Sequence, residues 1–174
     1  MESINPLSNL KSIAGLLLYN NSNLSSLDGL QNIELVEGAF RIDSNEKLSS
    51  LHALSSLSSV GATMGGDLVI INCPALTTLA GLEKVSLVGN DIIIKDNSHL
   101  LNLDALLSLK QINMGSIRII NNSALINMQG LSNLKSPLRD IEIQDNNALN
   151  QSAHYPTFQA RSIYGLSAIK ALRH

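Results

Sequence analysis

Residues 92–100 read Ile92-Ile93-Ile94-Lys95-Asp96-Asn97-Ser98-His99-Leu100. The pattern is an apolar residue, any residue, an apolar residue, two polar residues, Asn, two residues of any type and Leu. It occurs six times, and the Asn positions are Asn21, Asn45, Asn97, Asn122 and Asn146, with Cys73 in the third copy. The Asn or Cys positions of successive copies, which we call anchors, are 24, 28, 24, 25 and 24 residues apart (21 to 45, 45 to 73, 73 to 97, 97 to 122, 122 to 146). The chain is therefore built from an internal repeat with a period of 24–28 residues.

The apolar-any-apolar start of each copy has the alternation of a β-strand, in which one side chain points inward and the next points outward. One copy cannot bury its own apolar face, so the copies must stack on one another. After each closing leucine the chain continues in steps of three, as in Leu24, Leu27 and Leu30. These segments are short and rich in Ser, Asp and Gly, which favours a bent corner over a helix.

The sequence thus predicts a mainly β fold, a parallel β-helix or leucine-rich-repeat-like solenoid of about six coils over residues 1–151. Six short parallel strands should stack as one sheet, near residues 16–19, 40–43, 68–71, 92–95, 117–120 and 141–144. The Asn at the end of each strand should turn inward and form a structural ladder along the stack. We expect it to pair with the backbone, because an unpaired buried amide costs roughly 1–3 kcal/mol.

The composition narrows the function classes. Aromatic residues make up 3 % of the chain against 44 % hydrophobic residues, so the core must be aliphatic. A formal net charge of −2 gives no reason to expect nucleic acid or an anionic membrane as a partner. The single cysteine excludes an intrachain disulfide. No apolar run approaches the roughly 18 residues of a membrane span, and the first ten residues lack the basic and apolar regions of a signal peptide.

The corner sequence resembles a known family. The closing leucine comes three residues after the Asn, as in Asn21 and Leu24, and Leu27-Asp28-Gly29-Leu30 follows it. This order, completed by a Leu-x-x-Ile-x-Gly step, resembles the receptor L-domain repeat over residues 7 to about 150. That family includes the ligand-binding lobes of the epidermal-growth-factor and insulin receptors and many microbial surface proteins. The resemblance implies a right-handed solenoid, an extracellular or cell-surface location and a binding role.

The outward strand positions form two columns, which extend to Glu142 and Gln144 in the last copy. The candidate partner-binding residues among them are Leu17, Tyr19, Arg41, Asp43, Val69, Ile71, Ile93, Lys95, Arg118 and Ile120. Val69, Ile71, Ile93 and Ile120 should form an exposed apolar stripe, a feature that usually marks an interaction surface. Two alternatives stay open: the stripe is covered by the C-terminal tail or a flanking domain, or its β-branched residues serve strand propensity.

Catalysis finds little support in the sequence. Four histidines fall in different coils without metal-ligand spacing: His52, His99, His154 and His174. The outer carboxylates Asp43 and Glu142 stand four coils apart, whereas a polysaccharide-cleaving site needs a clustered pair. We therefore expect a non-catalytic binding module for a protein or glycan partner, with no metal and no cofactor. The alternatives are a polysaccharide-acting β-helix enzyme and a purely structural or adhesive surface solenoid.

The two ends of the chain lead to separate expectations. Residues 152–174 leave the repeat, and the spacing of Ile163, Leu166, Ile169 and Leu172 predicts a short amphipathic helix that caps the solenoid. At the other end, the hexapeptide Leu7–Ser12 recurs unchanged at residues 131–136, so the chain starts partway through a coil. We expect either an upstream continuation or self-association, through this end or through the outer sheet.

Overall fold

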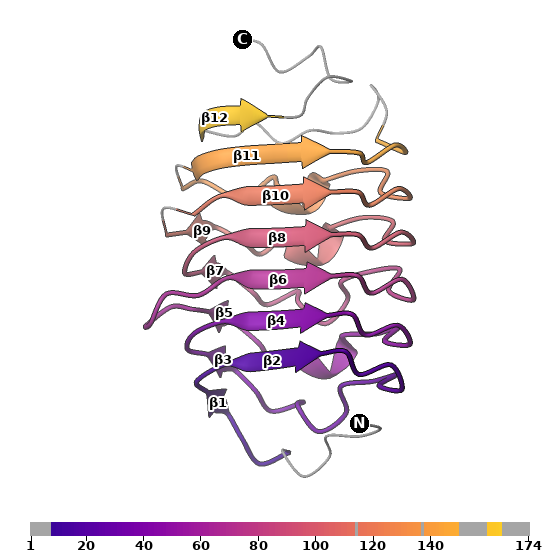
Figure 1. Ribbon diagram of the computed structural model, residues 1–174. Coiled ribbons are helices and arrows are strands. Elements are labelled where there is room, and N and C mark those ends of the chain that lie inside the picture. The colour runs from indigo at the N-terminus through magenta and orange to yellow at the C-terminus, as the bar shows by residue number, and fades with distance from the viewer. Residues whose placement is uncertain (1–7, 114, 137, 150–159, 165–174) are drawn as a thin grey trace.

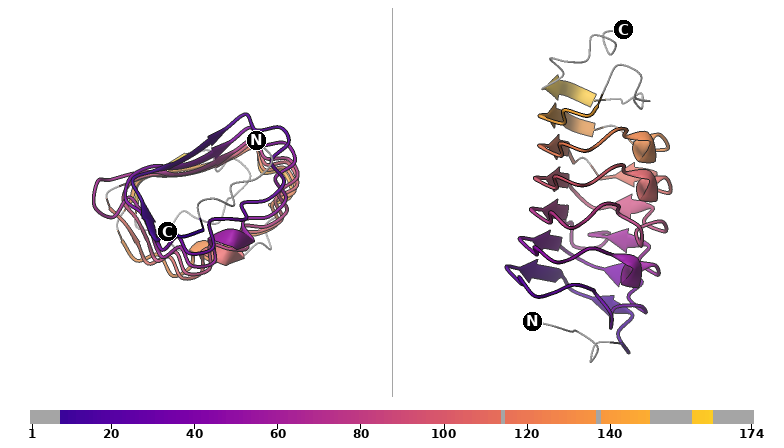
Figure 2. Two further views of the ribbon diagram at one scale, coloured as in Figure 1. Left: turned by 90° about the horizontal axis from the view of Figure 1, so that it is seen from below. Right: turned by 90° about the vertical axis from the view of Figure 1, so that its right-hand side faces the viewer.

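A computed structural model describes residues 8–113, 115–136, 138–149 and 160–164 (Figure 1). The described chain winds as a solenoid, and its coils superpose when viewed along the stack (Figure 2). Two parallel sheets line different sides of the coils, and aliphatic side chains fill the space between them. The predicted mainly β, parallel solenoid is confirmed.

The larger sheet has seven strands, in the spatial order β12-β11-β10-β8-β6-β4-β2. Their bounds are β2 (Leu16–Tyr19), β4 (Phe40–Asp43), β6 (Leu68–Ile71), β8 (Ile92–Lys95), β10 (Ile117–Ile120), β11 (Leu138–Gln144) and β12 (Ala160–Tyr164). Every neighbouring pair is parallel, and equivalent repeat positions stand side by side. The six strands expected from the repeat are all present, because the alternation and the fixed anchor spacing specify both the strand and its register.

A second sheet was not anticipated. It has five strands in the order β1-β3-β5-β7-β9, namely β1 (Ser12–Ile13), β3 (Leu35–Val36), β5 (Ser59–Val60), β7 (Leu87–Val88) and β9 (Gln111–Ile112). The expectation of one sheet was wrong, because strands of two residues are too short to show alternation. About five turns carry both sheets, one fewer than the six coils counted from the repeat.

Within the described residues, three short 3₁₀ helices form part of the bend between the two sheets. They are η2 (His52–Leu54), η3 (Asp104–Leu106) and η4 (Gln129–Leu131). Each lies in a segment where leucines recur every three residues, which is the period of a 3₁₀ helix. The steps of three therefore bring successive leucines into the core, as expected of a bent corner.

Rows of aliphatic side chains make the core. One coil illustrates them with residues that are all fully buried: Phe40, Ile42, Leu48, Leu51, Leu54, Leu57 and Val60. Each such side chain contributes roughly 1.5–3 kcal/mol on burial. Phe40 is the one aromatic residue of the described core, which agrees with the small aromatic content of the chain.

The C-terminal segment differs from the expectation. Residues Ala160–Tyr164 form strand β12, which pairs in parallel with β11 and places Ile163 beside Ile141. The predicted helix is therefore not supported at Ile163. The open edge of β11 offers backbone hydrogen bonds to an extended segment, whereas a short helix needs packing to be stable. The remaining positions of that predicted helix lie outside the described residues.

The corner after each of the six strands β2, β4, β6, β8, β10 and β11 turns through a left-handed residue. These residues have φ between 50° and 58°: Asn20, Ser44, Asn72, Asp96, Asn121 and Asp145. Asn and Asp adopt this conformation more readily than most residue types. The turn is followed directly by the repeat Asn, which is buried in four of the coils.

The repeat asparagines connect one coil to the next. Asn122 Oδ1 accepts the backbone N–H of Asn97 at 3.1 Å, and its Nδ2 donates to Ile94 O at 3.0 Å. Asn45, Asn97 and Asn146 make the same two kinds of bond to the coil before them. Each carboxamide thereby pairs a backbone donor and a backbone acceptor that the corner leaves outside the sheet.

Candidate binding surface

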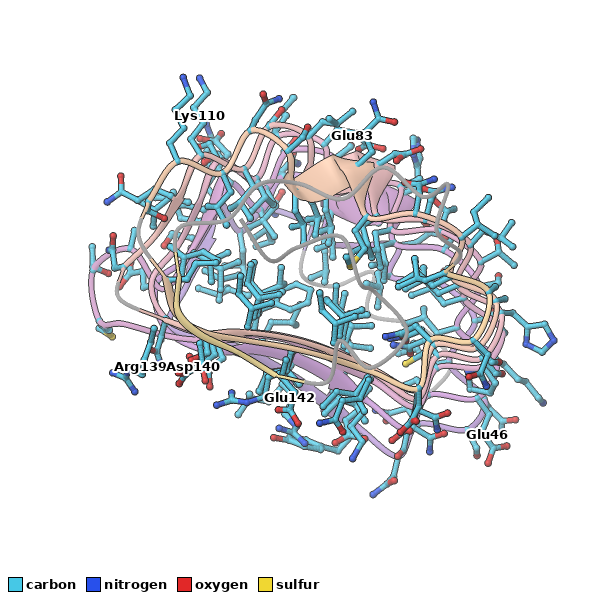
Figure 3. All side chains as sticks on the ribbon, turned by 90° about the horizontal axis from the view of Figure 1, so that it is seen from above. Glu46, Glu83, Lys110, Arg139, Asp140 and Glu142 are labelled. Carbon is cyan, nitrogen blue, oxygen red and sulfur yellow. The ribbon has the colours of Figure 1, made fainter. Side chains whose placement is uncertain are left out.

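The outer face of the seven-stranded sheet carries the two predicted columns in register. The first column is Leu17, Arg41, Val69, Ile93, Arg118 and Glu142, and the second is Tyr19, Asp43, Ile71, Lys95, Ile120 and Gln144. Figure 3 shows Arg139, Asp140 and Glu142 along this face, away from Glu83 and Lys110 on the opposite side of the coil. The structure thus brings all ten candidate residues onto one face.

The columns are less exposed than alternation alone suggests. Leu17 and Tyr19 are 56 % and 47 % exposed, because their strand β2 has a described neighbour on one side, β4. Val69 is only 3 % exposed, so the expected exposed stripe does not hold at this position. It lies between Arg41 and Ile93 in register, with a larger residue on each adjacent strand. Three half-buried isoleucines remain as the apolar centre of the face: Ile71, Ile93 and Ile120.

A charged cluster borders this apolar centre toward the N-terminus. Arg41 Nη2 lies 2.6 Å from Asp43 Oδ2, and Arg41 Nε donates to the same oxygen at 3.2 Å. The guanidinium carbon lies 5.4 Å from the centroid of the Tyr19 ring, within cation–π range. Ser44 Oγ donates to the other oxygen of Asp43. Arg41 and Asp43 are therefore held in place and neutralise one another.

A second charged cluster borders the apolar centre toward the C-terminus. Arg118 Nη1 lies 2.5 Å from Asp91 Oδ2, and Arg118 Nε lies 3.6 Å from Glu142 Oε2. The hydrogen bond that Arg118 donates to Asp91 is the main cause that raises the pKa of Arg118 above its ordinary value. Asp91 Oδ1 in turn accepts the backbone N–H of Ser116 at 2.7 Å. Arg118 is thus a permanently charged side chain fixed between two carboxylates.

Sequence reasoning missed Asp91, because it lies one residue before the nine-residue template. The same position holds Asp67 and Asp140 in other coils, and this recurrence was a detectable signal. Asp67 Oδ1 accepts Asn90 Nδ2 at 2.8 Å and the backbone N–H of Asp91 at 3.0 Å. These carboxylates line one margin of the outer face, so that polar groups border the three isoleucines on several sides.

The described residues contain few side chains placed to support catalysis at a metal ion. Within the described ranges, no three His, Cys, Asp or Glu side chains are grouped so that they could hold a metal ion. His52 and His99 are exposed on different coils, and His99 Nδ1 lies 2.8 Å from Pro74 O, while His154 and His174 lie outside the described residues. Asp43 and Glu142 stand on β4 and β11, with three strands between them.

The single cysteine is a structural residue. Cys73 is fully buried, and its thiol lies 3.4 Å from Ile71 O. Burial raises the pKa of the Cys73 thiol above its ordinary value, which keeps the group neutral and unreactive. No helix in the described part of the chain has the length and apolar character to cross a membrane.

One of three comparisons with known proteins agrees with the resemblance found in the corner sequence. A search of curated proteins and a search of solved structures each found no match. The family model of the receptor L domain matches residues 11–107, which is more than half of the chain. The matched segment begins just before β1, ends just after η3 and includes four strands of the larger sheet. The chain therefore belongs to the receptor L domain family.

Proposed function

We propose that this chain is a non-catalytic recognition module that presents the outer face of its seven-stranded sheet to a protein partner outside the cell or at its surface. Receptor L domains form a non-enzymatic family that binds protein ligands and is typically extracellular. Family membership supports the class of function, and the outer face described above supports the location of the contact.

The observation that carries the proposal is the arrangement of that face. Ile71, Ile93 and Ile120 form its apolar centre, while the clusters around Arg41 and Arg118 border it. Protein interfaces commonly have this form, with an apolar core inside a polar rim. Both arginines are already held by carboxylates, so ordering them on binding costs little side-chain entropy.

A protein partner fits this face better than a glycan does. Glycan recognition commonly uses aromatic rings that stack on sugar faces. From β2 to β11 the two outer columns contain one aromatic residue, Tyr19, and the guanidinium of Arg41 lies over its ring. Three β-branched aliphatic side chains make most of the centre of the face, with Lys95 in register between Ile71 and Ile120, and such a surface suits the apolar and acidic side chains of another protein.

The test is photo-crosslinking from a single position on the face. A photoreactive amino acid at Ile93 should capture one protein species from a surface or secreted fraction of the source organism. The same amino acid at Glu83, which lies on the opposite side of the coil (Figure 3), should not capture it. Excess unlabelled wild-type chain should abolish the capture, and excess Ile93→Glu chain should not.

Capture from both positions, or equal competition by the wild-type chain and Ile93→Glu, would contradict the proposal. Turnover in a glycan-depolymerisation screen that disappears in Asp43→Asn or Glu142→Gln would replace it with the polysaccharide-acting alternative. A circular dichroism spectrum of Ile93→Glu identical to that of the wild type is the folding control.

A further inference from the structure

Between β2 and β11 the two outer columns contain three cationic side chains, and two of them are paired closely with carboxylates. Arg41 Nη2 lies 2.6 Å from Asp43 Oδ2. Arg118 Nη1 lies 2.5 Å from Asp91 Oδ2. Both distances are those of charge-assisted hydrogen bonds. These two arginines therefore need no further anion when a partner covers the face.

Lys95 is the third cation, and its charge is compensated much less. Its Nζ lies 3.8 Å from Asp96 Oδ2, a distance longer than a hydrogen bond, and both side chains are partly exposed. Asp96 is held at the corner instead, because its Oδ1 accepts Asn121 Nδ2 at 2.7 Å. Exposed ion pairs of this kind contribute little to stability. The three N–H donors of the Lys95 ammonium group are thus available to an acceptor from another molecule.

The surroundings of Lys95 on the sheet are apolar. It stands in register between Ile71 on β6 and Ile120 on β10. Ile93 lies two residues before it, on the same side of β8. A partner that packs on these three isoleucines also removes water from the Lys95 side chain. An ammonium group that loses its water without gaining an acceptor is strongly unfavourable, so the partner must supply the acceptor.

We propose that Lys95 determines the specificity of the outer face by receiving an Asp or Glu side chain of the protein partner. The inference rests on the proposed function, because it requires a partner on this face. A carboxylate compensates an ammonium group best, since it brings the opposite charge and two acceptor oxygens. The contacting segment of the partner therefore carries an acidic residue among apolar ones. A basic residue at that position is disfavoured by like-charge repulsion.

The neighbouring charges fix where that carboxylate can lie. The Arg41 cluster is neutral, since one carboxylate compensates one guanidinium. The Arg118 cluster carries an excess negative charge, because Asp91 and Glu142 share one guanidinium, and it repels an anion. Of the three cations, Lys95 is the one whose nearest described carboxylate lies beyond hydrogen-bond distance. The acidic residue thereby sets the position of the partner along the stack of strands.

A water-soluble carbodiimide tests this contact, because it couples an amine to a carboxylate only where the two groups touch. Lys95 Nζ and the carboxyl carbon of the partner form an amide, and the carbodiimide takes up the lost water and becomes a urea. The chain carries Asp96→Asn, which removes the neighbouring carboxylate that would compete, and the probe is the surface or secreted fraction of the source organism. Mass spectrometry should find Lys95 joined to an Asp or Glu of the protein that Ile93 photo-crosslinks.

Lys95→Arg is the matched variant, because a guanidinium keeps the charge but does not couple. It should lose the carbodiimide product and keep the photo-crosslink from Ile93. Lys110→Arg, at an exposed lysine on the opposite side of the coil (Figure 3), should keep both. Lys95→Glu should weaken binding of the captured protein by roughly tenfold or more, because it places two carboxylates against each other.

A carbodiimide product that survives in Lys95→Arg would overturn the inference, and so would equal affinities of Lys95→Glu and the wild type. Photo-crosslinking from Ile93 without an amide at Lys95 would overturn this inference and leave the proposed function standing. Capture from neither position would overturn both. If circular dichroism shows that Lys95→Glu does not fold, the comparison of Lys95→Arg with Lys110→Arg still decides.

Discussion

Replacing Asn122 by alanine tests how the solenoid holds its corners together. The substitution removes the acceptor for the backbone N–H of Asn97, at 3.1 Å, and the donor to Ile94 O, at 3.0 Å. Both bonds are buried. An unsatisfied buried group costs roughly 1–3 kcal/mol, so the two together should lower the free energy of unfolding by roughly 2–6 kcal/mol. Domains of this kind have only about 5–15 kcal/mol in total, so the loss is large.

Asn21→Ala is the matched control, because Asn21 starts the ladder. Its Nδ2 donates to Tyr19 O in an exposed hydrogen bond, where water can replace the carboxamide. We expect a loss of about 1 kcal/mol or less in this variant. Urea denaturation followed by circular dichroism measures both free energies, and native-state hydrogen exchange should show lost protection at the Asn97 amide in Asn122→Ala alone. Similar losses in the two variants would refute the role assigned to the buried ladder.

Three further predictions concern Cys73 and Gly130. Cys73→Asn should raise the free energy of unfolding by about 1 kcal/mol, because its Oδ1 would accept the Asn45 N–H more strongly than the Cys73 thiol does and its Nδ2 would donate to Ile42 O; a lower urea midpoint would contradict this. Burial raises the pKa of Cys73 above its ordinary value of 9.0, so the stability that depends on the neutral thiol should be complete below pH 9.0 and fall as the pH rises further. Cys73→Ser should lack that loss above pH 9.0. Gly130→Ala should lower the thermal midpoint, since its Cβ would clash with the backbone oxygen of Leu103 on the preceding coil; an unchanged midpoint would show that the coils can separate locally.

The six strands of the larger sheet from β2 to β11 could be predicted from the sequence because two independent signals coincide there. Alternation identifies which residues point inward, and the recurring Asn defines where each strand ends. Residues such as Ile92–Lys95 therefore had one possible register against their neighbours. The outward columns follow from the same register, which is why the candidate residues lie on one face.

Other features depend on contacts that local patterns do not encode. The two-residue strands of the second sheet have no measurable period, and β12 is extended because β11 offers it an edge, although its spacing suits a helix. Alternation predicts that the Val69 side chain points outward, but it does not predict that Val69 is buried between Arg41 and Ile93 on the adjacent strands. The ion pair between Arg118 and Asp91 joins residues that are 27 positions apart, so the local sequence around either residue does not predict it.

The most direct test of the binding surface is the affinity of the partner captured by crosslinking for two matched variants. Ile93→Glu places a charge at the apolar centre of the outer face, and Leu107→Glu places the same charge at an exposed leucine that follows η3. Titration calorimetry should show that Ile93→Glu weakens binding by roughly tenfold or more, as for a central interface residue, while Leu107→Glu binds like wild type. Equal affinities of the two variants would contradict the assignment of the outer sheet face as the recognition surface.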